Sequence, residues 1–293
     1  MKIRLDQLLV EKQLAPSREK AKAMIMAGQV FVAGQKETKA GHMIKAEATV
    51  EVRGERLPYV SRGGLKLKRA LDVFGADPRG KICIDCGAST GGFTDCLLMH
   101  GAKAVYAVDV GYGQLDWKLR QDERVFVLER TNVRYLKPED IELTPSFATV
   151  DVSFISLGLI FPALKEILES PGEVICLIKP QFEAGREHVG KKGVVKDPRI
   201  HQEVIERVIE KAQGAGFCLN GLDYSPIRGP EGNIEYLAYL KKQENECLVS
   251  SDKRENSTCF DGNPIVFTDC EEEAGEKAWN VAKVVEEAHE NLV

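Results

Sequence analysis

The chain has 293 residues, of which 43% are hydrophobic and 29% charged, and its formal net charge is −5. These proportions are typical of a globular protein. The length allows one sizeable core and a smaller companion domain. The charged start at residues 2–6 argues against a signal peptide, and no apolar run approaches the roughly 20 residues that span a bilayer, so we expect a cytoplasmic protein with no membrane partner.

Residues 1–57 are predicted to form a small α+β domain. A first helix opens at Arg4, and a second follows Ser17, whose hydroxyl can cap it, and ends near Gly28. Strands are expected at 29–32 and 49–52, separated by glycine turns. A core of this size is marginal, so the domain should be attached to a larger one.

The first part of the chain is strongly basic. Residues 1–70 hold 15 Lys and Arg against 7 Asp and Glu, a net charge of +8. Such a region suits a polyanionic partner, although a lysine or arginine can also be a solvated surface charge. The residues that could neutralise RNA phosphates are Arg4, Arg18, Lys20, Lys22, Lys36 and Arg62.

Residues 58–80 are predicted to be a connector and a helix, and from residue 81 to 243 strands and helices alternate. Strands are expected at 81–85, 104–109, 125–128, 147–151, 173–179, 217–223 and 234–240. Helices are expected at 92–100, 114–121, 157–169 and 200–214. This order indicates an α/β domain with a seven-stranded, mostly parallel sheet. The short loop 225–232 should make the last two strands antiparallel.

The tail, residues 244–293, is acidic, with 4 Lys and Arg against 13 Asp and Glu. Its first part is polar, but Val281, Val285 and Ala288 recur at helical spacing. We therefore expect a short amphipathic helix within residues 271–292. The tail carries no recognisable functional motif.

Cys83 and Cys86 form a C-x-x-C pair, which raises the question of a zinc or redox site. A structural zinc site needs four ligands, and no second pair of cysteines or histidines follows at suitable spacing. Both cysteines also fall in an apolar run. They are predicted to be buried strand residues, and no metal is expected.

A glycine-rich turn follows the first strand of the α/β domain. Glycines at a strand-to-helix turn let a ligand approach the backbone. The acid before the first glycine would repel a diphosphate, whereas S-adenosylmethionine carries a sulfonium and an ammonium group. The cofactor residues predicted here are Asp85, Gly87, Ala88, Ser89, Thr90, Gly91, Gly92 and Phe93.

Asp109 ends the next strand, 24 residues after Asp85. An acid at this place can accept hydrogen bonds from both hydroxyls of an adenosine ribose, in a nicotinamide cofactor as well as in the methyl donor. Together with Asp85 it favours S-adenosylmethionine. A turn-forming role at the strand end is the alternative.

Four further charged residues lie at strand ends or in the helix after the connector: Lys66, Asp151, Lys179 and Glu235. Ligands of open α/β sheets bind beyond the carboxyl ends of the strands, where Asp151 and Lys179 are expected. Lys179 ends an apolar strand, where an unpaired charge is costly. A purely structural ion pair between Asp151 and Lys179 is the alternative to a catalytic role.

Taken together, the motifs in residues 1–242 resemble those of a known protein family. Five stretches match in order: 61–67 (SRGGLKL), 85–95 (DCGASTGGFTD), 151–154 (DVSF), 179–183 (KPQFE) and 232–236 (GNIEY). They are similar to the TlyA-type family, also labelled hemolysin A, which joins an S-four-type RNA-binding domain to an FtsJ-like Rossmann methyltransferase. The tail falls outside the resemblance.

The resemblance implies a function. FtsJ-like enzymes use a Lys-Asp-Lys-Glu tetrad, which corresponds here to Lys66, Asp151, Lys179 and Glu235. The family methylates ribose 2′-hydroxyls of cytidines in ribosomal RNA, so ribosomal RNA or ribosomal subunits are the expected partner and S-adenosylmethionine the cofactor. Two alternatives remain open: an assembly factor that binds rRNA without catalysis, and a membrane-active hemolysin. The acidic tail helix argues against the latter.

Overall fold

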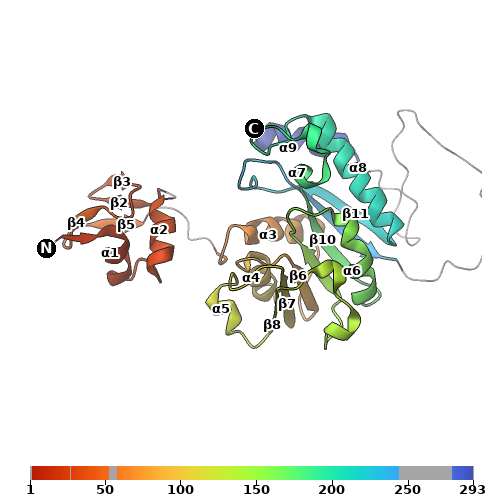
Figure 1. Cartoon of the computed structure of the whole chain (residues 1–293), viewed down its shortest axis with the longest axis horizontal. Helices are drawn as coiled ribbons and strands as arrows, with labels where there is room; N and C mark the ends of the chain where they lie inside the picture. Colours follow the sequence, from red (N-terminus) through yellow and green to blue (C-terminus); the bar gives the residue numbers. More distant parts are fainter. Residues whose placement is uncertain (1, 27, 53–57, 244–278, 293) are drawn as a thin grey trace, which may run out of the picture. The chain divides into compact units, whose positions relative to one another are not determined.

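The computed structural model describes residues 2–26, 28–52, 58–243 and 279–292. The chain divides into two compact units, Met1–Leu57 and Pro58–Val293, called here the small unit and the large unit. The helices and strands are labelled in Figure 1.

The small unit packs two helices against short antiparallel strands. Its elements are β1 (Lys2–Arg4), α1 (Leu5–Glu11), α2 (Arg18–Met26), β2 (Val30–Val32), β3 (Gln35–Glu37), β4 (Met43–Lys45) and β5 (Val50–Val52). β1 pairs with β4, and β2 lies between β3 and β5. The Ser17 hydroxyl accepts a hydrogen bond from Lys20 N at 3.2 Å, as the predicted helix cap requires.

Both helices and two strands of this unit were predictable, whereas β1, β3 and β4 were missed. Each missed strand has three residues, two of which are exposed. A period of two cannot be recognised over three residues. The core they enclose is small and includes Leu5, Leu9, Ile25 and Val30, all fully buried.

The large unit contains a seven-stranded sheet in the order β11-β12-β10-β9-β6-β7-β8. The strands are β6 (Ile82–Cys86), β7 (Ala104–Asp109), β8 (Val125–Glu129), β9 (Phe147–Val150), β10 (Glu173–Ile178), β11 (Phe217–Tyr224) and β12 (Tyr236–Lys242). β12 is antiparallel to both of its neighbours, and the other pairs are parallel. The predicted fold class and the antiparallel last pair are confirmed.

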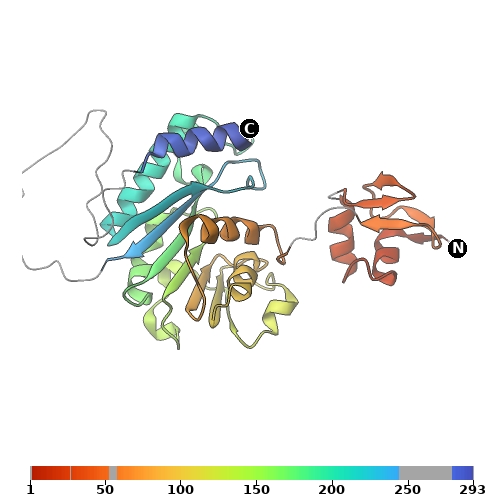
Figure 2. The same cartoon turned by 180° about the vertical axis from the view of Figure 1, so that it is seen from behind.

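Helices cover both faces of this sheet (Figures 1 and 2). They are α3 (Gly63–Phe74), α4 (Gly92–Met99), α5 (Trp117–Arg120), α6 (Phe161–Ile167), α7 (Pro180–Glu183), α8 (Pro198–Gly214) and α9 (Val281–Leu292). One apolar core lies beneath α3 and α4, and a second beneath α6, α8 and α9. The central strands are therefore buried on both faces, which explains why they appear in the sequence as apolar runs.

The helix expected at 157–169 is broken in the structure. A single 3₁₀ turn at Leu157–Leu159 precedes α6, and Leu168 is already extended. Pro162 lies at the start of α6, where its missing N–H removes no helical hydrogen bond. The helix expected at 114–121 is also shorter, because Asp116 caps it from outside by accepting from Lys118 N at 3.0 Å.

The amphipathic tail helix is present as α9, and its predicted start at 271–278 lies outside the described residues. α9 runs alongside α8 (Figure 2), with Val281, Val285 and Ala288 buried in the core. The sequence placed this helix beyond the α/β domain. In the structure it belongs to the large unit.

Candidate active site

The site lies beyond the carboxyl ends of β6, β7, β9 and β10, where the loops after these strands meet. Gly87 begins the turn after β6 and has φ +88°. A Cβ at this position would lie 2.6 Å from the Asp151 carbonyl oxygen, so no other residue fits. The glycine therefore lets the loop after β6 contact the backbone that follows β9.

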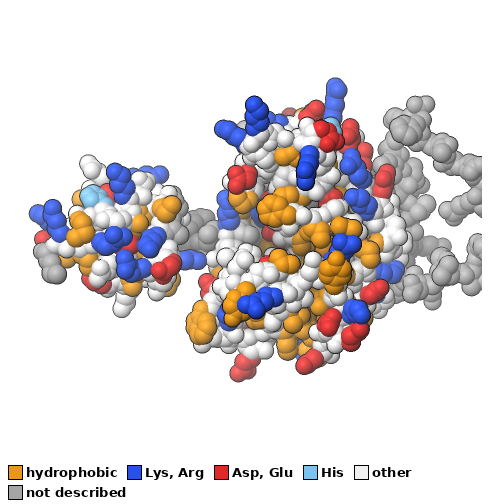
Figure 3. All heavy atoms as spheres, in the orientation of Figure 1, with side chains coloured by type: hydrophobic (Ala, Val, Ile, Leu, Met, Phe, Trp, Pro, Cys, Tyr) orange, Lys and Arg blue, Asp and Glu red, His pale blue; other side chains and the backbone are white. Residues whose placement is uncertain are grey.

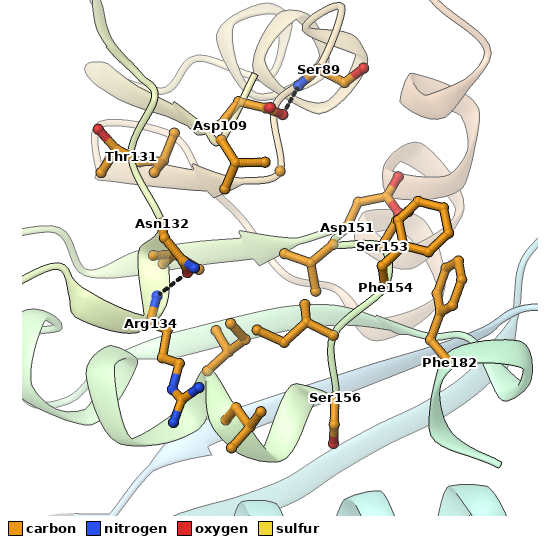
Figure 4. Close-up of a pocket in the computed structure, with 18 of the residues that line it drawn as sticks. Ser89, Asp109, Thr131, Asn132, Arg134, Asp151, Ser153, Phe154, Ser156 and Phe182 are labelled. Atoms are coloured by element: carbon orange, nitrogen blue, oxygen red, sulfur yellow. Dashed lines mark hydrogen bonds between the residues drawn. The ribbon is translucent and has the colours of Figure 1, made fainter. Parts of the chain in front are cut away.

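Asp109, at the end of β7, is held by the backbone of two loops. One carboxylate oxygen accepts from Ser89 N at 2.8 Å and the other from Gly111 N at 2.7 Å. The first of these bonds is drawn in Figure 4. Each carboxylate oxygen has two lone pairs, so Asp109 can still accept hydrogen bonds from a ligand.

A cavity of about 720 Å³ opens beside these residues, within the size range of small-molecule sites. Its walls come from the segments after β6, β7, β8, β9 and β10 (Figure 4). The apolar part of the lining is Val108, Val110, Val133, Val152, Phe154, Ile155, Leu159, Ile160 and Phe182. The polar part is Ser89, Asp109, Gln114, Thr131, Asn132, Arg134, Asp151, Ser153 and Ser156.

A second, smaller cavity of about 160 Å³ adjoins the first, because Gly87, Ser89 and Asp151 line both. The remaining lining of the smaller cavity is Ser61, Arg62, Gly63, Lys66, Ala88, Thr90, Gly92, Phe93 and Pro230. Two of the four predicted tetrad residues, Lys66 and Asp151, thus lie at one cavity although they are 85 positions apart in the sequence.

The four tetrad residues form two enclosed ion pairs. The Lys66 ammonium donates to Glu235, and both side chains are buried. The Lys179 ammonium lies 2.6 Å from Asp151 Oδ1. That oxygen accepts no hydrogen bond from the described residues, so the contact is an ion pair without hydrogen-bond geometry. Lys179 instead donates to the Ser153 hydroxyl at 3.1 Å.

The segments 151–157 and 179–183 contact each other along their length. Beyond the Lys179 contacts, the rings of Phe154 and Phe182 lie 4.9 Å apart at the edge of the cavity (Figure 4). Phe154 has φ +64° and is 90% exposed, although it belongs to the cavity wall. Glu183 then accepts from the Ser156 hydroxyl and from Leu157 N, both at 2.7 Å.

The structure brings most of the predicted cofactor residues to the two cavities. Gly87, Ser89 and Asp109 line the larger one. Ala88, Thr90, Gly92 and Phe93 line the smaller one, whereas Gly91 lines neither of the two.

Asp85 does not lie at either cavity, contrary to the sequence-based expectation. Its side chain is fully buried, and its oxygens accept from Thr94 at 2.6 Å and from Thr149 at 3.1 Å. Burial raises the pKa of Asp85 to about 7, and the two threonine hydroxyls oppose this shift. Asp85 therefore connects β6 to α4 and β9 through buried hydrogen bonds, just before the glycine-rich loop.

Several lining residues were missed by the sequence reasoning. Asn132, Val133 and Arg134 follow β8 and contribute one wall, and the Asn132 side chain accepts from Arg134 N at 3.1 Å (Figure 4). No motif marks them, and only their position after a strand could have suggested a role. Ser153 and Glu183, in contrast, belong to stretches that the family resemblance had already included.

The predicted RNA-contacting residues fall into two groups. Arg62 lies on the large unit and lines the smaller cavity. The other five lie on the small unit and are exposed: Arg4, Arg18, Lys20, Lys22 and Lys36. Figure 3 shows Lys and Arg side chains gathered on the visible face of that unit.

Cys83 and Cys86 are buried and unbridged on β6, and burial raises the pKa of the Cys83 thiol to about 12. Within the described ranges, no three His, Cys, Asp or Glu side chains are grouped so as to hold a metal ion. None of the helices in those ranges is long and apolar enough to cross a membrane.

Comparison with known protein families matches each of the two units to a family. Residues 59–242 match the FtsJ-like methyltransferase family. The chain belongs to that family. Residues 3–50 match the S4 domain, so this FtsJ-like methyltransferase carries an S4 domain in its small unit.

Several relatives of this FtsJ-like methyltransferase are known. YqxC of Bacillus subtilis, named as a candidate rRNA methyltransferase, is 55% identical over 240 residues, which cover 82% of this chain and 85% of YqxC. TlyA of Mycobacterium tuberculosis, named as a 16S/23S rRNA (cytidine-2′-O)-methyltransferase, is 44% identical over 247 residues, covering 84% and 92%. A solved structure from Streptococcus thermophilus, described as a candidate hemolysin, has 46% identity and a TM-score of 0.72, covering 99% and 96%.

Proposed function

We propose that this FtsJ-like methyltransferase transfers a methyl group from S-adenosylmethionine to the 2′-hydroxyl of a cytidine ribose in ribosomal RNA. The proposal depends most on one observation. Lys66 and Asp151 line the same small cavity beside the glycine loop, and each is paired with a further tetrad residue. The names of the rRNA-modifying relatives and the S4 domain support the choice of RNA as substrate.

The residues of the larger cavity fit S-adenosylmethionine. The apolar lining can take the adenine ring, and the Asp109 carboxylate can accept from ribose hydroxyls. Gly87 lines both cavities, and the absence of a side chain there lets a ligand contact its backbone. When bound, S-adenosylmethionine supplies an electrophilic methyl group, which the protein does not have to activate.

The chain's own residues would act mainly on the acceptor hydroxyl. A ribose hydroxyl is a poor nucleophile at neutral pH, so it must lose its proton or be held in line for attack. We assign Lys179 to this task. Its ammonium can hold the hydroxyl in line by donating to it, whereas only the neutral amine form could accept the proton. The group is held by Asp151 and Ser153, which both line the larger cavity. Lys66 and Glu235 would hold the opposite side of the acceptor site.

The RNA would be retained by the basic side chains of the small unit and by Arg62. Contacts to phosphates provide affinity without base specificity. Selection of a 2′-hydroxyl as the acceptor would by itself exclude DNA.

The test is transfer of radiolabelled methyl from S-adenosylmethionine to unmethylated rRNA or ribosomal subunits, followed by nucleoside analysis. We expect label in 2′-O-methylcytidine. Label in a base-methylated nucleoside would overturn the ribose assignment while leaving the family intact. Binding of cofactor and RNA without transfer of label would instead favour an assembly factor.

A further inference from the structure

Asp6 is a fully buried carboxylate in the small unit, and two arginines from different elements meet on it. Arg4 ends β1 and donates twice, from Nε to Oδ1 at 3.0 Å and from Nη2 to Oδ2 at 2.9 Å. Arg18 begins α2 and donates from Nη2 to Oδ2 at 3.3 Å. The Arg4 guanidinium, and to a smaller extent Arg18, lowers the pKa of Asp6 to about 2 against the opposing effect of burial, so the acid is ionised at neutral pH.

The two arginines remain accessible although the acid is not. Their side chains are 44% and 49% exposed. Arg4 uses its Nε–Nη2 edge on the carboxylate, which leaves the Nη1 group outside this contact. A guanidinium has five N–H donors in a planar fork, so each arginine retains donors for a further acceptor.

The shared acid removes two obstacles to binding one anion with both arginines. Two guanidinium groups brought together without an acid repel each other. Each long side chain that a ligand must immobilise also costs about 0.5–1.5 kcal/mol. Asp6 offsets the repulsion and has already ordered both side chains before a ligand arrives.

We propose that Asp6 is a positioning residue, which presents Arg4 and Arg18 as a preassembled pair to a phosphodiester of the RNA backbone. A phosphodiester is the anion that fits, because the pair lies in the basic part of the chain and guanidinium groups bind phosphate oxygens through paired N–H bonds. The inference rests on the proposed function, since it requires RNA as the partner.

The proposal makes a prediction opposite in sign to that of simple electrostatics. Asp6→Asn removes a negative charge from an RNA-binding surface, which by charge alone should strengthen RNA binding. If Asp6 acts by positioning, the variant binds more weakly, by roughly fivefold to thirtyfold. Glu47→Gln is the matched control, because Glu47 is an exposed acid of the same unit and the change in charge is identical. The control should bind as tightly as the original chain or more tightly.

The measurement is the dissociation constant of the full chain for an rRNA fragment at several salt concentrations. A thermodynamic cycle adds Asp6→Asn to a variant with Arg4→Gln and Arg18→Gln, where the asparagine should cost no further affinity. Asp6→Asn that binds as tightly as Glu47→Gln, or that weakens binding equally without the arginines, overturns the proposal.

Asp6 is buried, so its replacement could unfold the small unit. Arg18→Lys avoids this difficulty, because it keeps the charge at an exposed position but removes the planar fork. We expect this variant to lose affinity too, and an unchanged affinity would count against the proposal. Lack of RNA binding by the unaltered chain would instead refute the proposed function itself.

Discussion

The two units both bring acids and cations together, but with opposite exposure. In the small unit the acid is buried and its two arginine partners reach into solvent. In the large unit Lys66 and Lys179 are themselves enclosed with their acids. Exposed cations act over distance and are screened by salt, whereas enclosed ones are screened little and keep a fixed position. Under the proposed function, the same residue types would therefore retain a polyanion in one unit and align the acceptor hydroxyl in the other.

The largest effect is expected from Lys179, the enclosed lysine that we assign to the acceptor hydroxyl. Lys179→Ala should lower the rate of methyl transfer by roughly 10²- to 10⁴-fold, because the group that deprotonates or aligns the hydroxyl is lost. The dissociation constant of the cofactor should change by less than about twofold, whereas a loss of 1.4 kcal/mol in binding free energy would change it tenfold. Single-turnover transfer and cofactor titration would measure both. Full activity would remove Lys179 from the catalytic set.

A second variant tests, through the free energy of unfolding, whether the Lys66–Glu235 pair is shielded from water. Glu235→Leu leaves the Lys66 ammonium buried without its acid, which should lower the free energy of unfolding by about 3–5 kcal/mol. Adding Lys66→Met should recover much of this loss, because the unpaired charge disappears. Denaturant unfolding of both variants measures the difference. Equal stability of the single and double variants would mean that water reaches the pair.

The exposed cations of the small unit should show a smaller effect that depends on salt. Arg18→Glu should weaken rRNA binding about tenfold at physiological salt and reduce the slope of log affinity against log salt by about one. Lys45→Glu, an equal change in charge at another exposed position, is the control and should cost less. An Arg18 variant indistinguishable from that control would place Arg18 outside the RNA contact.

Asp85 offers a test through pH, because its enclosure involves hydroxyls and no cation. Its pKa of about 7 in the folded chain lies above the ordinary 3.8, so the folded state binds more protons than the unfolded state between these pH values. The free energy of unfolding should therefore fall as pH rises from about 4 to 7, by at most about 1.4 kcal/mol per unit. In Asp85→Asn this decline should flatten. Parallel pH profiles of thermal unfolding would contradict the assignment.

Much of the large unit could be predicted from the sequence, because its strands are buried on both faces and appear as separate apolar runs. The strand expected at 104–109 coincides with β7, and the one expected at 217–223 differs from β11 by one residue. The family resemblance selected Lys66, Asp151, Lys179 and Glu235, whose two ion pairs the structure brings together. Their catalytic role stays a prediction.

What the sequence could not predict depends on contacts between distant segments. The acid before the glycine loop looks the same in sequence whether it faces a ligand or two threonines, and only the approach of Thr149 on β9 decides the matter. Likewise, Asp6 resembles any acid in a first helical turn until Arg18 arrives from α2. The wall formed by Asn132 and Arg134 carries no motif, because irregular loops are fixed by their surroundings.

The docking of α9 has a consequence for the large unit as a whole. Val281, Val285 and Ala288 are buried in the same core as residues of α6 and α8, although α9 follows the last strand of the sheet in the sequence. Apolar surface that is removed from water contributes about 25 cal/mol per Å² to stability. A chain that stops before Val281 would therefore keep every strand of the seven-stranded sheet but leave part of its core open to solvent.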